Sequence, residues 1–172
     1  MHDVPSLETD RLILRGHRPD DLVDCAPMWA DPNVTRFIGG RPLSREEVWM
    51  RLLRNVGHWS LFGYGFWVVR ERASDEFVGE VGLAEFKRDL EPSIEGTPEI
   101  GWVLAPRAHN HGFATEAVRA ALAWFEGEFG RVKTVCLIDP GNAPSLRVAA
   151  KCGYVERVRT TLRGQATVVL ER

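Results

Sequence analysis

A short run of basic and small residues at positions 107–115 has the residue types and spacing needed to hold an anion. Arg107, His109 and His111 lie just before Gly112, and an amphipathic helix is predicted to follow. Its apolar residues recur at helical spacing, at Ala114, Ala117, Val118, Ala121, Leu122 and Phe125. The first backbone N–H groups of a helix lack intrahelical partners, and the helix dipole places about half a positive charge there. The segment therefore suits a phosphate or pyrophosphate, although an ordinary strand–loop–helix junction would have the same pattern.

The composition is that of an ordinary globular protein. The chain has 172 residues, 44% of them hydrophobic and 27% charged, so we expect one domain, residues 1–172, with a substantial core. A net charge of −2 offers no basic face for nucleic acid. No apolar run approaches the length of a membrane span, and residues 1–10 lack the apolar centre of a signal peptide. We therefore expect a cytoplasmic protein with no nucleic-acid or membrane partner.

The cysteines do not suggest a metal site. Cys25, Cys136 and Cys152 are odd in number, widely spaced and contain no C-x-x-C pair. This usage is typical of reduced, mostly buried thiols in a cytosolic protein. We expect no metal.

The first half of the chain alternates strands and helices. Ser44 and Glu47 form a capping-box pattern that predicts the start of a helix. Pro19 suits the first turn of a shorter helix, which Pro27 should distort or end. Residues 31–42 are predicted to be a loop. Strands are expected at 10–15, 63–71 and 76–86, and helices at 19–28 and 45–58.

The second half repeats this alternation. Gly101, in the middle of an expected strand, predicts either a bulge or the close approach of another chain segment. Gly153 suits the left-handed end of a short helix. Residues 87–97 are predicted to be a solvated loop. Strands are expected at 98–104, 132–138, 154–159 and 166–170, and helices from about 112 to 127 or 130 and at 144–151.

This order of elements predicts an α+β (mixed α/β) fold built in layers around one sheet. The predicted core residues come from both halves of the chain. They are Leu12, Leu14, Trp67, Val69, Val81, Leu83, Ile100, Trp102, Val118, Leu122, Val135, Leu137 and Val148.

Five sequence blocks in this order resemble the GCN5-related N-acetyltransferases (GNAT), in particular the branch that includes ribosomal-protein alanine N-acetyltransferases. A single G-x-A turn is weak support, but five blocks in the same order span nearly the whole chain. The blocks are ETDRLILR with the following PDD, FVGEVGL, EIGWVL, HGFATEA, and NAPS through KCGY. The resemblance implies a single central, mostly antiparallel twisted sheet of about seven strands flanked by helices. Its fourth and fifth strands, at 98–104 and 132–138, would splay apart to admit acetyl-CoA.

The resemblance also implies a set of site residues. The backbone of Trp102, Val103 and Leu104 would pair with the pantetheine arm. Asn142 would hydrogen-bond the pantetheine or orient the thioester. Ser145 would lie near the sulfur and protonate the departing thiolate, a role that Tyr154 could also fill. The pyrophosphate would bind the N–H groups of His109, Asn110, His111, Gly112, Phe113, Ala114 and Thr115.

The turn departs from the pattern of the family at two positions. His109 and Asn110 stand where Gln or Arg and then often Gly are usual. Asn tolerates a left-handed backbone better than most residues, and the contacts with the pyrophosphate are mainly through backbone N–H groups. We therefore expect CoA binding to survive the change.

Acetyl transfer to an amine needs a neutral amine, a positioned thioester, a stabilised oxyanion and a proton for the leaving thiolate. A backbone N–H near Val103 could stabilise the oxyanion. The candidates for the general base are Glu99, Glu80 and His58, acting directly or through water. Each carboxylate could instead be a solvent-facing acid on a strand, and His58 could serve packing and capping.

The predicted function is that of an acetyl-CoA-dependent N-acetyltransferase, an acyltransferase that transfers groups other than aminoacyl groups. The amine of a protein N-terminus or of a small molecule would attack directly in a ternary complex. The alternative is a catalytically weak acyl-CoA-binding or sensing module of the same fold. A nucleotide-binding protein is least supported, because no Gly-rich phosphate-binding pattern of that class follows a strand. The acceptor stays open, as does the choice between monomer and homodimer.

Overall fold

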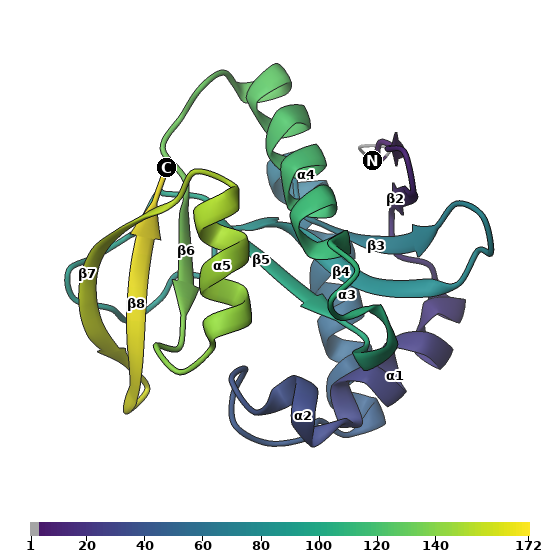
Figure 1. Cartoon of the computed structure of the whole chain (residues 1–172), viewed down its shortest axis with the longest axis horizontal. Coiled ribbons are helices and arrows are strands. Elements are labelled where there is room, and N and C mark those ends of the chain that lie inside the picture. The colour runs from purple at the N-terminus through teal and green to yellow at the C-terminus, as the bar shows by residue number, and fades with distance from the viewer. Residues whose placement is uncertain (1–3) are drawn as a thin grey trace.

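The computed structural model describes residues 4–172 and shows one eight-stranded sheet with helices packed against it (Figure 1). The strands are β1 (Leu7–Glu8), β2 (Leu12–Arg15), β3 (Phe66–Glu71), β4 (Phe77–Ala84), β5 (Glu99–Leu104), β6 (Val135–Ile138), β7 (Val155–Leu162) and β8 (Gln165–Glu171). The helices are α1 (Leu22–Ala30), α2 (Pro32–Thr35), α3 (Arg45–Phe62), α4 (Phe113–Phe129) and α5 (Ala143–Lys151), with short 3-10 turns η1 (Pro19–Asp21) and η2 (Pro106–Ala108). The predicted mixed α/β architecture is confirmed, with eight strands instead of about seven.

The sheet is antiparallel except at one pair of strands. The strand order is β1-β2-β3-β4-β5-β6-β8-β7, and only β5 and β6 run parallel. β4 and β5 pair without interruption over six positions, from Gly79 opposite Leu104 to Ala84 opposite Glu99. Gly101 therefore marks a close approach and not a bulge, because a Cβ added there would lie 3.0 Å from Cζ of Phe66.

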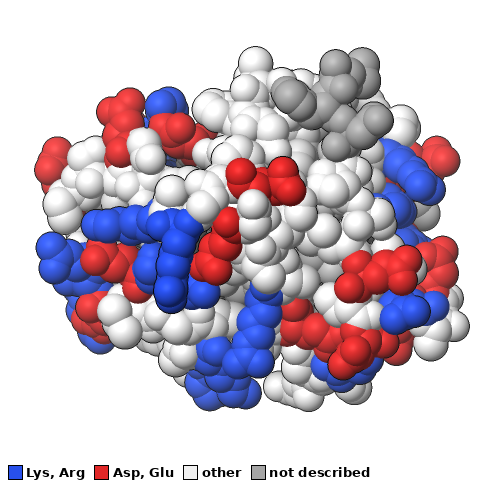
Figure 2. Space-filling model, turned by 90° about the horizontal axis from the view of Figure 1, so that it is seen from above, with Lys and Arg blue, Asp and Glu red and all other residues white. Residues whose placement is uncertain are grey.

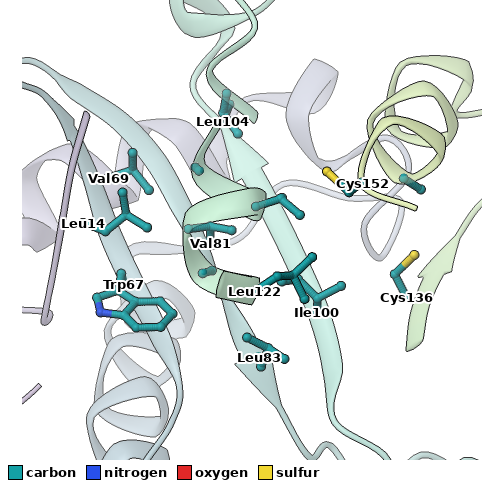
Figure 3. Packing of buried hydrophobic residues seen from close by; sticks show 14 of the residues in the cluster. Leu14, Trp67, Val69, Val81, Leu83, Ile100, Leu104, Leu122, Cys136 and Cys152 are labelled. Atoms are coloured by element: carbon teal, nitrogen blue, oxygen red, sulfur yellow. The ribbon is translucent and has the colours of Figure 1, made fainter. Parts of the chain in front are cut away.

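Two layers of helices enclose the sheet, with α4 and α5 in front and α1 and α3 behind in the view of Figure 1. On the α4 side the core includes Trp67, Val81 and Ile100, and Ile100 lies beside Leu122 of α4 (Figure 3). On the other side, Val68 and Val103 pack with residues of α1 such as Met28 and Trp29. Most predicted core residues are buried as expected, but Trp102, Leu137 and Val148 are only half-buried.

Helix α3 begins and ends as its sequence dictates. The Ser44 hydroxyl accepts from the Glu47 N–H at 3.2 Å, and the Glu47 carboxylate accepts from the Ser44 N–H at 2.8 Å. This is the predicted capping box, in which each residue satisfies the exposed donor of the other. The helix ends at Gly63, whose φ of 73° is accessible to glycine at little cost. It is one turn longer than predicted.

Other boundaries differ from the prediction for local reasons. Helix α2 interrupts the predicted loop 31–42, because the Asp31 side chain accepts from the Asn33 N–H and caps it. Pro27 lies inside α1 without ending it. The strand predicted from residue 132 begins only at Val135, since residues 132–134 follow the left-handed Gly130 that ends α4.

The surface carries charges of both signs. Figure 2 shows Lys and Arg side chains interspersed with Asp and Glu on one face of the molecule. Within residues 4–172, no helix combines the length and the apolar character needed to cross a membrane.

The packing of α4 predicts a large cost for truncating its core face. Leu122→Ala should lower the free energy of unfolding by about 2–5 kcal/mol, because it leaves a cavity between α4 and the sheet. Leu61→Ala is the matched control; Leu61 is 80% exposed, so the change should stay within about 0.5 kcal/mol. Urea denaturation followed by circular dichroism measures both. Equal effects for the two variants would contradict the described packing.

Candidate functional site

A wedge between β5 and β6 organises the candidate site (Figure 1). These parallel strands share one registered pair, Glu99 with Val135, beside which the Val135 N–H donates to the Pro98 carbonyl at 3.0 Å. Beyond that pair the strands diverge, and in the described part of the chain residues 100–104 have no partner strand on the β6 side. The free edge of β5 can therefore pair with an extended ligand, as an added strand would.

Both strands of the wedge lead into helices at its wide end. α4 begins at Phe113 shortly after β5, and α5 begins at Ala143 shortly after β6. Ligands of α/β proteins commonly bind in such crevices beyond the carboxyl ends of parallel strands, where the N-termini of helices can face an anion. The wide end of the wedge is thus the place where a negatively charged group is best accommodated.

The turn before α4 has the backbone conformation that such an anion site needs. Asn110 and Gly112 are both left-handed, with φ of 64° and 80°. The prediction that Asn110 can adopt this conformation is confirmed, and Asn does so more readily than most residues. Within residues 4–172 no side chain caps α4, so its first N–H groups remain open to a ligand.

Arg11 is a further cationic group at this turn. Its Nη1 donates to the His111 carbonyl at 2.9 Å, and its guanidinium lies 4.7 Å from the centroid of the Phe113 ring. Glu116 accepts from Nε of Arg11 at 2.8 Å and from the Thr9 hydroxyl at 2.6 Å. Arg11 therefore ties the β1–β2 turn to the first turn of α4. No local sequence pattern indicated this role, because the contact joins segments about a hundred residues apart.

A groove of about 660 Å³ runs beside the same turn. Arg119 and Lys151 line it, and Nη2 of Arg119 donates to the Lys151 carbonyl at 2.8 Å. Arg11 and Glu116 also line the groove but form an ion pair with each other, and Asp10 adds one further carboxylate. The positive charges of Arg119 and Lys151 can therefore face a second anionic group next to the turn.

The basic side chains predicted at the turn are largely used in local structure. Arg107 donates to the Glu76 carboxylate and to the Phe77 carbonyl. Nε2 of His109 lies 3.0 Å from the Leu104 carbonyl oxygen, and His111 stacks on Phe113 with ring centroids 5.6 Å apart. The side chains shape the turn, which leaves the backbone N–H groups as the donors for a ligand.

Asn142 and Ser145 lie together at the start of α5. The Asn142 side-chain oxygen accepts from the Ser145 N–H at 3.3 Å, so Asn142 caps the helix. Both residues are half-buried. Because β6 leads directly to them, they lie at the wide end of the wedge. They face α4 across the wedge, on the same face of the sheet (Figure 1).

Tyr154 lies at the other end of the wedge and is buried. Its hydroxyl is 2.6 Å from the Thr134 hydroxyl, just before β6. Burial raises the pKa of Tyr154 more than this hydrogen bond lowers it. The phenol therefore stays protonated and already has a partner.

Glu99 lies at the narrow end of the wedge, in the one pair that β5 and β6 share. Its side chain is buried, and its two oxygens accept from Nε and Nη2 of Arg88 at 2.9 and 2.7 Å. This forked geometry is the strongest arrangement available to an arginine and a carboxylate. The sequence indicates Glu99 as a candidate but gives no sign that Arg88 donates to both of its oxygens.

Glu80 is the centre of a buried polar network on the α1–α3 side of the sheet. Its Oε1 is 2.6 Å from Nε2 of His17 and accepts from Asn55 at 3.2 Å, and its Oε2 accepts from the Trp29 indole at 2.7 Å. Burial by itself would raise the pKa of Glu80, but hydrogen bonds from His17 and Trp29 outweigh it and lower the pKa below its ordinary value. This geometry supports a structural role for Glu80, which is buried and is therefore not the solvent-facing acid of the alternative interpretation.

His58, the third candidate base, is also engaged on both nitrogens. Nδ1 lies 2.7 Å from the Tyr64 carbonyl oxygen, and Nε2 accepts from the Glu85 N–H at 3.0 Å. This pattern requires the neutral ring with its proton on Nδ1. Burial, with a smaller effect from the positive charge of Arg54, lowers the pKa of His58. Its geometry supports the packing and capping role.

The described residues contain no cluster of three or more His, Cys, Asp and Glu side chains that could hold a metal ion. Cys25, Cys136 and Cys152 are buried free thiols, and burial raises the pKa of each.

Comparison with known proteins assigns the family. A family model described as an acetyltransferase (GNAT) domain matches residues 11–155. The uncharacterized protein YkkB of Bacillus subtilis (strain 168) is 31% identical over 165 residues, which cover 92% of this chain and 91% of that protein. The chain belongs to the GNAT acetyltransferases, and the family predicted from its sequence blocks is confirmed.

Solved structures agree with this assignment. A putative GnaT-family acetyltransferase from Bordetella pertussis has a TM-score of 0.86 and 31% identity, with 98% of this chain and 99% of that chain covered. A spermidine N-acetyltransferase from Vibrio cholerae, solved with CoA and spermine, shares the fold with a TM-score of 0.74, 18% identity and coverage of 95% and 96%. By family, the chain is an acyltransferase of the class that transfers groups other than aminoacyl groups.

The Glu80 network predicts a pH-dependent stability. Glu80→Gln should lower the free energy of unfolding by about 2–4 kcal/mol at pH 7, because it removes a buried, fully hydrogen-bonded charge. The pKa of Glu80 is depressed in the folded state, so its contribution is present above the unfolded pKa of about 4.3 and is lost as the pH falls through the folded pKa.

Denaturation of both proteins between pH 3 and pH 8 measures this effect. The difference between Glu80→Gln and the parent should narrow below about pH 4. Glu156→Gln, which alters an exposed acid on β7, is the control and should change little. A difference that stays constant across this range would contradict the role given to Glu80.

Proposed function

We propose that the chain is an acetyl-CoA-dependent N-acetyltransferase that transfers an acetyl group to a primary amine by direct attack in a ternary complex. The wedge carries this proposal, because its free β5 edge leads toward the open first turn of α4. An extended arm containing amide groups matches such an edge, and a pyrophosphate matches such a helix start. Bound acetyl-CoA would supply the thioester that the amine attacks.

Each part of the cosubstrate has a complementary group in the chain. The backbone of Trp102, Val103 and Leu104 would pair with the pantetheine arm. The N–H groups from His109 to Thr115 would hold the pyrophosphate, while Arg119 and Lys151 line the adjacent groove. Asn142 would keep its role as a cap of α5 and could orient the arm through its amide group. Such positioning can lower the barrier by about 7–11 kcal/mol in the best-oriented systems.

Ser145 is the better of the two proton donors. The amine nitrogen forms the new C–N bond, the C–S bond breaks, and the thiolate must receive a proton. Ser145 is half-buried on the first turn of α5. Tyr154 is buried, its hydroxyl is paired with Thr134, and its pKa is raised. Because the Tyr154 hydroxyl is buried and already paired with Thr134, we assign the donor role to Ser145 and a structural role to Tyr154.

Glu99 is the remaining candidate for removing the proton of the amine. It lies where β5 and β6 still pair, and the thioester would lie inside the wedge, between Glu99 and Ser145 at the start of α5. Because both of its oxygens bond Arg88, it would act through a water molecule or after Arg88 gives up one oxygen. The engagement of Glu80 and His58 argues against either as a direct base.

A second candidate function is an acyl-CoA-binding or sensing module of the same fold. The saturation of Glu80, His58 and Glu99 favours it, since none of the three offers an unoccupied basic atom. The two functions differ in turnover and not in binding. Tight acetyl-CoA binding without CoA release on any amine would select the sensing module.

The proposed role of Ser145 predicts a selective loss of turnover. Ser145→Ala should reduce CoA release by about 10²–10⁴-fold, which is the usual contribution of a positioned general acid. Acetyl-CoA binding should change little, because the arm and the pyrophosphate are held by other groups. Ser60→Ala, at an exposed position of α3, serves as the control.

Thiol release and isothermal titration calorimetry measure the two quantities separately. Failure of the parent protein to bind acetyl-CoA would overturn the proposed function. Equal loss of binding and turnover in Ser145→Ala would show that Ser145 holds the cosubstrate and is not a proton donor.

The turn before α4 predicts opposite effects for two substitutions of Asn110. Asn110→Gly should preserve or tighten CoA binding, since glycine adopts the φ of 64° without strain. Asn110→Val should weaken binding about tenfold or more, because a β-branched residue resists the left-handed conformation. Calorimetry with CoA measures both. A large loss in Asn110→Gly would show that the Asn110 side chain itself contacts the ligand.

A further inference from the structure

Three arginines gather on the side of the sheet opposite α4, next to the narrow end of the wedge. Arg51 and Arg54 lie on α3, and Arg88 follows β4. We call these three residues the arginine cluster. Arg88 is joined to Glu99, the residue at which β5 and β6 still pair, so the cluster adjoins the place where the two strands separate.

Aromatic rings hold the guanidinium groups in place. The carbon centres of the Arg54 and Arg88 guanidiniums lie 5.4 and 4.4 Å from the centroid of the Phe86 ring. That of Arg51 lies 3.8 Å from the Trp29 ring centroid. Stacking of this kind fixes the plane of a guanidinium and leaves its N–H edge available for a ligand.

A further aromatic residue links the cluster to the β5 backbone. The Phe86 ring centroid is 6.2 Å from that of Phe66, and Phe66 lies over Gly101 in the middle of β5. The cluster is therefore connected through aromatic contacts to the strand along which the arm of the cosubstrate would run.

One of the three arginines makes a direct ion pair. Arg88 has Glu99 as its partner. Among the described residues, neither Arg51 nor Arg54 has a carboxylate within salt-bridge distance, and Nε of Arg51 is buried without a hydrogen-bond partner. Burial, together with the positive charge of Arg54, lowers the pKa of Arg51 to about 10. The negative charge of Glu80 raises the pKa of both Arg51 and Arg54, but its oxygens are hydrogen-bonded to His17, Trp29 and Asn55 and not to either arginine.

The position of the cluster is that of an acceptor site. With the pyrophosphate at the first turn of α4, the arm would carry the thioester into the wedge, between Ser145 and Glu99. α4 packs over β4 and β5 on one side of the sheet, and α1 and α3 lie on the other, so the incoming amine would reach the wedge on this second side, beside α3. An acceptor approaching there would meet the arginine cluster.

We propose that the acceptor is a small amine that also carries a carboxylate, which binds Arg54 and Arg51. This inference rests on the proposed N-acetyltransferase function and names its class of substrate. Arginine binds carboxylates in a planar, two-point geometry. A polycation such as spermidine would place its charges against the arginines, and like charges in a confined site are strongly disfavoured.

Matched pairs of amines test the proposal. CoA release is measured with each common amino acid, with the corresponding carboxamide, and with spermidine and an aminoglycoside. For the best amino acid, kcat/KM should exceed that of its carboxamide by about tenfold or more. Equal or faster turnover of carboxamides or polycations would overturn the inference and leave the proposed function standing. If none of the amines causes CoA release, or if calorimetry detects no acetyl-CoA binding, the result would count against the proposed function itself.

Variants of Arg54 test whether this residue binds the carboxylate of the acceptor. Arg54 is exposed, so Arg54→Gln should fold normally, which its Tm would verify. It should raise KM for the amino acid about tenfold and leave the carboxamide unchanged, while Arg54→Lys retains part of the affinity. Arg45→Gln makes the same change of charge at an exposed position at the start of α3 and should have no effect. Equal effects of Arg54→Gln on both substrates would contradict the proposed carboxylate contact.

Discussion

The candidate site depends on the limited pairing between strands β5 and β6. Each is paired along its whole length with another neighbour, β5 with β4 and β6 with β8. Between them there is only the pair of Glu99 and Val135. Because each strand is secured from its far side, the two can part without either losing its place in the sheet. The hydrogen-bonding groups of the β5 edge, which an uninterrupted sheet would satisfy internally, are thereby offered to a ligand.

The divergence of β5 and β6 also determines the shape and charge of a ligand that fits between them. A parallel pair sends both chains in the same direction, so the helices that follow begin at one end of the wedge. The Arg11 contacts with His111, Phe113 and Glu116 fix the first of these helix starts from outside. The side chains around the turn bond to one another and to nearby carbonyls, and the backbone N–H groups of α4 are left over. An extended ligand with an anionic end satisfies both parts of this arrangement.

The three candidate bases all make hydrogen bonds to other groups of the chain. Glu80 accepts from the Trp29 indole, Glu99 accepts from Arg88, and His58 bonds two backbone groups. In the proposed function, the proximity and orientation of the substrates therefore contribute more than a strong free base. Among the described residues, Arg51 and Arg54 make no direct ion pair, and in our proposal they contribute to the choice of the acceptor.

Much of the architecture follows from local sequence. Ser44 and Glu47 predict the start of α3 because a capping box satisfies its own donors, and the apolar stripe of α4 predicts its buried face because helical spacing needs no distant information. The strands followed from β-branched and aromatic runs, with errors only at their ends. Helix α2 was missed because it is one turn long and depends on a single cap from Asp31. Trp102 and Leu137 were expected in the core but border the wedge, where one neighbouring strand is missing.

The sequence by itself determined the family, and it indicated the turn before α4, Asn142 and Ser145 as candidate site residues, because each of these lies in a contiguous block whose spacing carries the information. Only the tertiary structure decided which charged groups are free. Arg11, Arg88 and His17 act on Glu116, Glu99 and Glu80, and two of these three pairs join residues more than sixty positions apart. A carboxylate looks the same in a sequence whether it is solvated, paired or buried. Its role is settled by the partner that folding brings to it.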